Sequence, residues 1–195
     1  MFARTAETLT KKLKENNTIT AEQYEICRYG FQQGLTIIFN AVTTIAIGVV
    51  FDELWQAVLF MAAYAPLRSY AGGYHAKTAE RCYVYSILLM IAVLLAIKYV
   101  ALPNFICIIT LLISCTVIAV LAPVEDSNKP LDSLEQVVYR KTTLMITAIE
   151  IIMFFISLTL GWKEMALCIV WVLAVMAVML LGGKWKNRRT KGLFC

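Results

Sequence analysis

The chain has 195 residues, of which 60% are hydrophobic and only 16% are charged, and its mean hydropathy is +0.71. Soluble globular domains average about 45–50% apolar and about 25% charged residues, so this composition excludes an ordinary soluble domain and indicates a membrane protein. The net charge of +5 comes without the motif of any nucleic-acid-binding module, and we expect no nucleic-acid partner. One histidine and no Cys-x-x-Cys pair leave no spacing typical of a structural metal site.

We expect an all-α, polytopic membrane protein that begins with amphipathic helices. Residues 1–15 are polar, and a few apolar side chains fall on one helical face: Phe2, Leu9 and Leu13. Residues 20–33 are also amphipathic, and Thr20 and Gln23 have the spacing of a capping box at their start. Residues 1–33 are therefore predicted to lie along the membrane surface or to pack on the protein as solvated helices.

Six hydrophobic segments follow and are candidates for membrane-spanning helices, at residues 34–51, 54–70, 83–100, 104–122, 143–160 and 164–182. A spanning helix needs about 20 residues, with a range of about 17–25. The second segment is the weakest, because its apolar stretch ends at Pro66 and Arg68 and reaches only about 21 Å of a core about 30 Å thick. It either borrows polar interfacial residues or does not cross cleanly. We assign residues 34–182 to a transmembrane core and residues 183–195 to a basic tail of one domain, 1–195.

The distribution of charge supports six spans. If both termini are cytoplasmic, all but two of the 18 basic residues fall on the inner side, and the exceptions are Lys98 and Lys163. The positive-inside rule therefore predicts a multi-pass protein of the cell membrane with both termini in the cytoplasm. The polar loop between the second and third spans also faces the cytoplasm in this arrangement. We expect the basic inner face to contact anionic membrane lipids.

That polar loop holds the only histidine, His75, and seven residues later Cys82. A thiol near an imidazole is the minimum for a cysteine nucleophile and its base. On a straight helix the two side chains lie about 10 Å apart along the axis, beyond the reach of about 2.6–3.2 Å that proton transfer needs. The chain must therefore turn, and Gly72-Gly73 breaks the preceding helix while Thr78 is placed to cap the next one.

Cys82 then lies about one turn into the third span, where a helix N-terminus and a cation such as Arg81 favour a thiolate. The N–H groups of Gly72 and Gly73 are candidates for stabilising an oxyanion; the alternative is that these glycines only end a helix. Arg68 is a candidate for pairing with a substrate carboxylate; the alternative is an interfacial arginine that meets lipid headgroups. With six cysteines in the chain, one can also fall near the histidine by accident.

Glu150 is the one carboxylate clearly inside a predicted span. An ionisable group within a membrane is by default a candidate functional residue. Lys98 is a possible partner, although the predicted depths of the two residues differ. The alternative is a neutral, hydrogen-bonded glutamic acid.

Two stretches resemble the accessory gene regulator B (AgrB) family. The first is the pattern Arg68…Gly72-Gly73-Tyr74-His75-Ala76…Cys82, and the second runs from Ala122-Pro123 to Lys129-Pro130, like the family's loop between spans four and five. The hydropathy layout extends the resemblance over nearly the whole chain. The resemblance implies a membrane-embedded cysteine endopeptidase of Gram-positive quorum sensing, with Cys82 as the nucleophile, His75 as its base, and no cofactor or metal.

The resemblance further implies an AgrD-like precursor peptide as the partner. Such an enzyme removes the precursor's C-terminal tail and holds the remainder as an acyl-enzyme thioester, which a cysteine or serine of the peptide attacks to give a cyclic thiolactone or lactone. The alternatives are a peptide transporter without covalent chemistry, or a membrane scaffold. A transporter of this length needs to dimerise to enclose a path, so a homodimer remains open.

Overall fold

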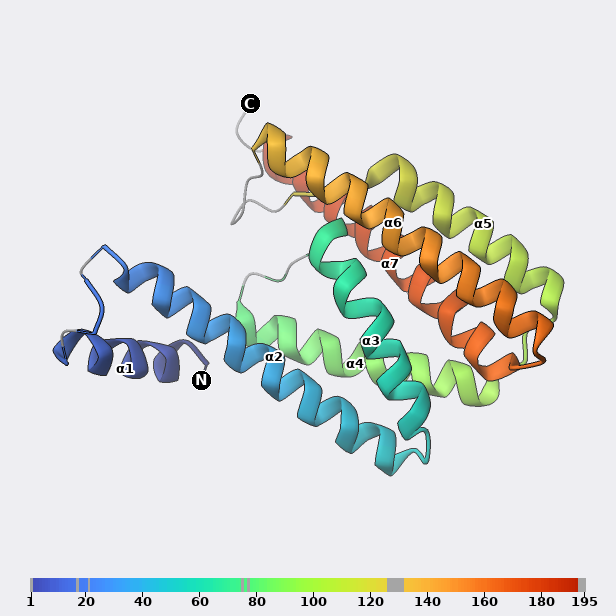
Figure 1. Cartoon of the computed structure of the whole chain (residues 1–195), viewed down its shortest axis with the longest axis horizontal. Helices are drawn as coiled ribbons and strands as arrows, with labels where there is room; N and C mark the ends of the chain where they lie inside the picture. Colours follow the sequence, from blue (N-terminus) through green and yellow to red (C-terminus); the bar gives the residue numbers. More distant parts are fainter. Residues whose placement is uncertain are drawn as a thin grey trace.

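The computed structural model describes residues 2–16, 18–20, 22–74, 76, 78–125 and 132–192, with side chains to residue 188. These residues form helices and no strand, apart from one isolated bridge between Gly72 and Val124 (Figure 1). The helices are α1 (Phe2–Glu15), α2 (Tyr24–Val50), α3 (Leu54–Ala71), α4 (Ala79–Tyr99), α5 (Asn104–Leu121), α6 (Ser133–Thr159) and α7 (Lys163–Gly192). The predicted all-α fold is confirmed.

Five helices are long and apolar enough to cross a membrane, namely α2, α4, α5, α6 and α7. Of the six predicted spans, the one that is not among these five is α3, which has 18 residues and contains Pro66. Its two ends still reach opposite ends of the bundle. Gln56 Nε2 donates to Glu164 Oε2 at 2.9 Å in the first turn of α7, whereas the Tyr74 N–H donates to Met179 O at 2.9 Å far along α7. At 1.5 Å per residue α3 is about 27 Å long, whereas the hydrocarbon core of a membrane is about 30 Å thick.

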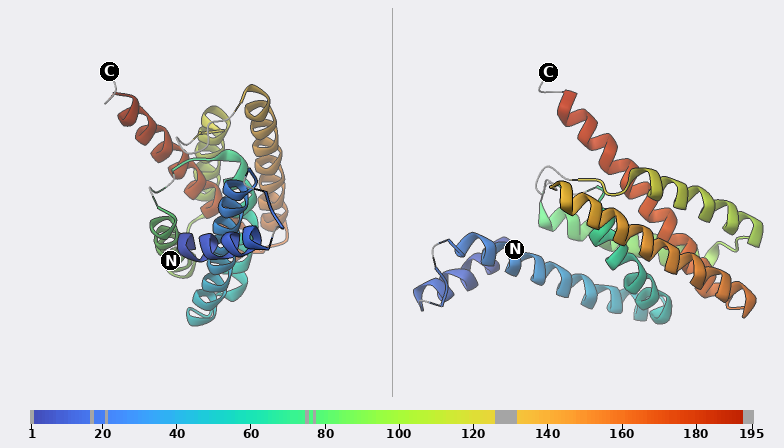
Figure 2. Two further views of the ribbon diagram at one scale, coloured as in Figure 1. Left: turned by 90° about the vertical axis from the view of Figure 1, so that its left-hand side faces the viewer. Right: turned by 45° about the horizontal axis from the view of Figure 1, so that its top comes forward.

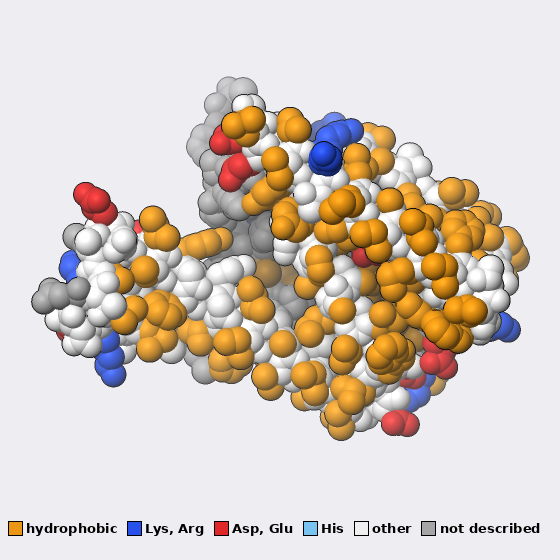
Figure 3. Space-filling view, viewed as in Figure 1, with side chains coloured by type: hydrophobic (Ala, Val, Ile, Leu, Met, Phe, Trp, Pro, Cys, Tyr) orange, Lys and Arg blue, Asp and Glu red, His pale blue; other side chains and the backbone are white. Residues whose placement is uncertain are grey.

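Helix α7 forms the centre of the bundle. It packs against α3, α5 and α6, and over a smaller area against α4 (Figures 1 and 2). Its inward face is fully buried at Cys168, Leu173, Met176 and Leu180. The outward-facing side chains of the other helices are largely apolar, and Figure 3 shows them covering the middle of one face while charged side chains gather mainly at its edges. This is the surface expected of a protein whose solvent is lipid.

Helix α1 folds back along the start of α2, and the two project from the bundle as a helical hairpin (Figures 1 and 2). The Phe2 ring makes edge contacts with Phe39 of α2 and Tyr83 of α4, with ring centroids 5.2 and 5.6 Å apart. The buried stripe of α1 continues through Ala6 and Thr10, whereas Leu9 is 38% exposed. The predicted face was therefore right for Phe2 and wrong for Leu9, while Leu13 is half-buried, because the buried stripe follows every fourth residue from Phe2.

Two predicted boundaries fall inside helices. The residue 33/34 boundary lies within α2, which is continuous from Tyr24 to Val50, so the second amphipathic segment and the first span are one helix. The reciprocal hydrogen bonds predicted for Thr20 and Gln23 are present in the turn before α2, at 3.1 and 3.3 Å. The 182/183 boundary lies within α7, so the basic tail begins as a helix.

Candidate functional site

Cys82 lies in the first turn of α4, at the start of a predicted span. Its N–H donates to Thr78 O at 3.0 Å, and Thr78 Oγ1 accepts from the Arg81 N–H at 3.3 Å. Thr78 is thus the N-cap of α4, as predicted, and Cys82 is a free, half-buried cysteine about one turn into the helix. His75 lies outside the described residues, so its approach to Cys82 stays a prediction.

Gly72 and Gly73 end α3 with φ angles of 72° and 113°, which favour glycine. The Gly72 N–H donates to Arg68 O and the Gly73 N–H to Val124 O, both at 3.2 Å. A Cβ on Gly72 would lie 2.1 Å from Val124 O, so only glycine allows this approach. Both N–H groups are used within the protein in this conformation. Their role as oxyanion donors stays a prediction, and it requires these bonds to open.

Arg68 closes the same turn. Its guanidinium donates from Nη1 to Gly72 O and from Nη2 to Tyr74 O, so the planar fork holds two carbonyls of one short segment. A substrate carboxylate or a lipid headgroup as the partner of Arg68 stays a prediction. The two bonds hold the segment that leads to His75, because Tyr74 directly precedes His75 in the chain.

Residues 122–125 form a second connection that packs against the glycine turn. The Val124 N–H donates to Ala71 O at 2.9 Å. Glu125 is held from both sides, since Asn187 Nδ2 donates to its carbonyl at 2.7 Å and Gln136 Nε2 donates to its carboxylate at 2.5 Å. A hollow of about 280 Å³ lies beside this connection. The connection begins the loop identified by the family resemblance, and Lys129 and Pro130 of that loop lie outside the described residues.

Tyr74 links the turn to two helices. Its ring lies 6.3 Å from the Tyr85 ring on α4, three residues beyond Cys82, and the Lys186 ammonium of α7 lies 5.6 Å from the Tyr74 ring centroid. The turn and the cysteine therefore share one end of the bundle.

Glu150 and Lys98 do not meet, in line with the difference in their predicted depths. Lys98 Nζ donates to Phe51 O at 2.6 Å at the far end of α4, whereas Glu150 is buried within the bundle at 4% exposure. Neither carboxyl oxygen of Glu150 has a hydrogen-bond partner among the described residues, so the alternative of a hydrogen-bonded acid is not seen either. The two residues fail to meet because they lie at different depths.

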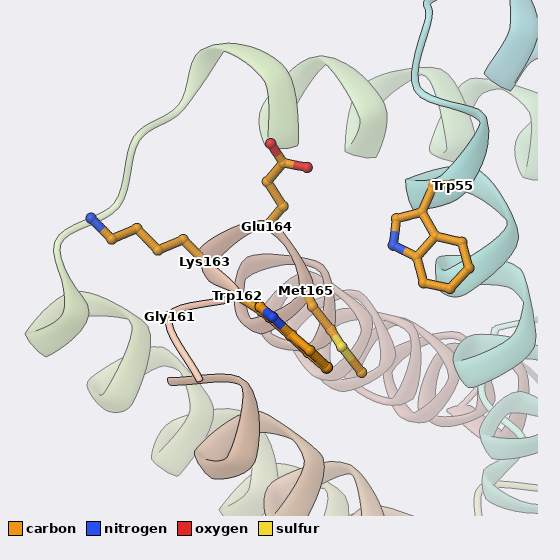
Figure 4. A pocket seen from close by; sticks show the side chains of 6 residues that line it. All are labelled: Trp55, Gly161, Trp162, Lys163, Glu164 and Met165. Carbon is orange, nitrogen blue, oxygen red and sulfur yellow. The ribbon is translucent and has the colours of Figure 1, made fainter. Parts of the chain in front are cut away.

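A larger hollow, of about 440 Å³, opens at the end of the bundle opposite Cys82 (Figure 4). It is lined by Trp55, Gly161, Trp162, Lys163, Glu164 and Met165. Tryptophans at this level are typical of a membrane–water interface, and the lining contains no cysteine, serine, threonine or histidine. At the same end, burial raises the pKa of Glu53, while the nearby Lys98 ammonium opposes that rise. Among the described residues, no group of three or more His, Cys, Asp or Glu side chains could hold a metal ion.

Comparison with known proteins identifies the family. The family model of Accessory gene regulator B matches residues 6–180. The chain is 24% identical to an AgrB-like protein of Clostridium perfringens (strain SM101 / Type A) over 95% of this chain and 89% of the relative. It is 27% identical to an AgrB-like protein of Halalkalibacterium halodurans over 48% of this chain and 47% of that relative. No solved structure gives a significant match. Because the family match covers most of its length, the chain belongs to the accessory gene regulator B family.

Proposed function

We propose that this protein is a membrane-embedded cysteine endopeptidase that converts an AgrD-like precursor peptide into a cyclic thiolactone or lactone. Family membership carries the coarser statement that the chain takes part in peptide processing for agr-type quorum sensing. One observation supports the finer proposal. Cys82 is a free thiol in the first turn of α4, at the end of the bundle where Arg68 and two glycines shape the segment that leads to His75.

The proposed chemistry uses two acyl transfers. His75 takes the proton of the Cys82 thiol, and the thiolate attacks the carbonyl before the precursor's tail. The C–N bond breaks, the tail leaves with a new amino terminus that receives the proton, and the remaining peptide is held on Cys82 as a thioester. A thiol or hydroxyl of the peptide then attacks that carbonyl. Its proton passes through His75 to Cys82, which leaves as the free thiol.

Exclusion of water decides between cyclisation and hydrolysis. Exchange of one thioester for another changes the free energy little, whereas water would release the peptide uncyclised. The half-buried setting of Cys82 at the edge of the membrane supports the exclusion of water. Transport without covalent chemistry has less support, because the Glu150 and Lys98 side chains do not meet.

We propose that this end of the bundle faces the cytoplasm, as the positive-inside rule predicts. The Lys186 ammonium lies over the Tyr74 ring, Lys184 and Arg188 belong to the same last turns of α7, and the chain is basic overall. A positive surface beside the cysteine attracts an acidic peptide segment and anionic headgroups alike.

Co-expression with the precursor peptide encoded beside the gene tests the proposal, with tail loss followed by mass spectrometry. We expect Cys82→Ala and His75→Ala to abolish processing while the protein still inserts into the membrane. Cys27→Ala is the matched control, because Cys27 is also a half-buried free cysteine but lies near the start of α2, and it should process normally. Processing at the wild-type rate by Cys82→Ala would contradict the proposal.

A further inference from the structure

The turn after α3 meets α7 backbone to backbone. The Tyr74 N–H donates to Met179 O at 2.9 Å. An ideal Cβ on Gly183 would lie 2.6 Å from Gly73 C and 2.8 Å from Tyr74 N, and one on Gly73 would lie 2.9 Å from Met179 O. Real Cβ atoms essentially never approach other atoms this closely. Two glycines, one on each segment, therefore make the contact possible.

Residue 183 also controls access to the Met179 carbonyl. In an α-helix the carbonyl of residue i already accepts from the N–H of residue i+4, and here that residue is Gly183. Helical side chains lean toward the N-terminus and cover the preceding turn. A side chain at position 183 would lean over the turn of Met179, whereas glycine leaves its oxygen open to the Tyr74 N–H.

The contact bears on His75, because Tyr74 is the residue before it. The same turn is tied by Arg68 through the Gly72 and Tyr74 carbonyls and by the Gly73 N–H to Val124 O. Lifting the turn off α7 would therefore shift the attachment point of His75 relative to α4, which carries Cys82. A general base must lie within about 2.6–3.2 Å of the proton it takes, so small displacements are costly.

We propose that the C-terminal helix α7 completes the catalytic site, and that Gly183 is a positioning residue that seats the turn carrying His75. The inference rests on the proposed function, because it takes His75 and Cys82 as the reacting pair. Gly183 thus contributes to catalysis although it lies about 100 residues from Cys82 in the sequence, on a helix that holds neither reacting group.

The neighbouring glycine provides the matched control. A Cβ on Gly182 would have only Tyr74 Cβ within 4 Å, at 3.7 Å, which is an ordinary van der Waals contact. Both glycines lie inside α7, so Gly182→Ala and Gly183→Ala raise the helix propensity equally. We expect Gly182→Ala to process the precursor within about twofold of wild type. For Gly183→Ala we expect kcat to fall by on the order of 100-fold with little change in KM, because the methyl group misplaces the base without touching the substrate.

A second readout separates this inference from the proposed function. The rate at which iodoacetamide alkylates Cys82 is measured against pH, with the site resolved by mass spectrometry, in wild type and in Gly182→Ala, Gly183→Ala and His75→Ala. We expect Gly183→Ala to follow the His75→Ala profile and Gly182→Ala to follow wild type. A wild-type profile and wild-type processing in Gly183→Ala would overturn the positioning role alone. A wild-type profile in His75→Ala would overturn the reacting pair, and the positioning role with it.

If Gly183→Ala fails to insert into the membrane, hydrogen–deuterium exchange on the wild-type protein tests the contact between Tyr74 and Met179 directly. The Tyr74 amide is expected to exchange slowly because it is bonded to Met179 O. Exchange as fast as that of an exposed amide would overturn the contact itself.

Discussion

Replacing Arg68 with lysine tests whether the arginine acts through the planar shape of its guanidinium or only through its charge. The guanidinium holds the Gly72 and Tyr74 carbonyls at once, and an ammonium keeps the charge but lacks the planar fork. A hydrogen bond to a charged group contributes about 1.5–3 kcal/mol. Losing one of the two bonds therefore lowers the ratio of closed to open turn on the order of 10- to 100-fold, since about 1.4 kcal/mol corresponds to a factor of ten.

The assay is single-turnover processing of the precursor in detergent or vesicles, with thermal unfolding measured in parallel. We expect Arg68→Lys to slow processing by on the order of 10- to 100-fold and to lower the melting temperature by about 3–12 °C, since about 1 kcal/mol corresponds to about 2–4 °C in a chain of this size. Arg81→Lys is the control, since Arg81 is exposed beside Cys82 and keeps its charge in the variant, and its rate should match wild type. Wild-type processing by Arg68→Lys would show that the planar fork is not needed, and would favour a partner that needs charge alone, such as a substrate carboxylate or a headgroup.

Two further predictions concern parts of the chain away from the turn. Glu150 is buried without a hydrogen-bond partner, with Cys115 of α5 and Cys168 of α7 nearby, so a charge there would be uncompensated. Glutamine is an uncharged isostere of the acid, so Glu150→Gln should keep the melting temperature in detergent within about 2 °C, whereas Glu150→Lys should not accumulate in the membrane. A large fall in the melting temperature of Glu150→Gln would indicate a charged carboxylate with a partner. Phe2→Ala removes a buried ring that packs α1 against α2 and α4, so it should weaken this packing by about 3 kcal/mol. Limited proteolysis within α1 should then be faster in Phe2→Ala and unchanged in Leu9→Ala. Equal cleavage rates in the two variants would show that Phe2 does not anchor the helix.

Local signals in the sequence predicted much of this structure. Hydropathy located the spans, the Thr78 cap set the start of α4, and the interval from that cap put Cys82 in the first turn. Pro66 and the short apolar run correctly marked α3 as the weakest span. Each of these features depends on residues a few positions apart, where helix geometry fixes the spacing.

The contacts that shape the turn could not be read in this way, because each joins distant segments. The Arg68 side chain bonds carbonyls that come together only after the chain turns, and Val124 and Met179 meet the turn from elsewhere in the chain. Leu9 was misplaced because helical periodicity does not state which face of a helix meets a neighbour. Gly182-Gly183 within an apolar helix was the one available signal, since such glycines often mark close backbone packing in membranes.

The thioester on Cys82 is tested by the mass of the protein quenched in acid shortly after it meets its precursor peptide. We expect a mass increase equal to the tail-free peptide less one water, located on Cys82, released by hydroxylamine as a thioester should be, and absent from Cys82→Ala and His75→Ala. Tail removal that proceeds in Cys82→Ala, or an adduct on another residue, would contradict the thioester on Cys82.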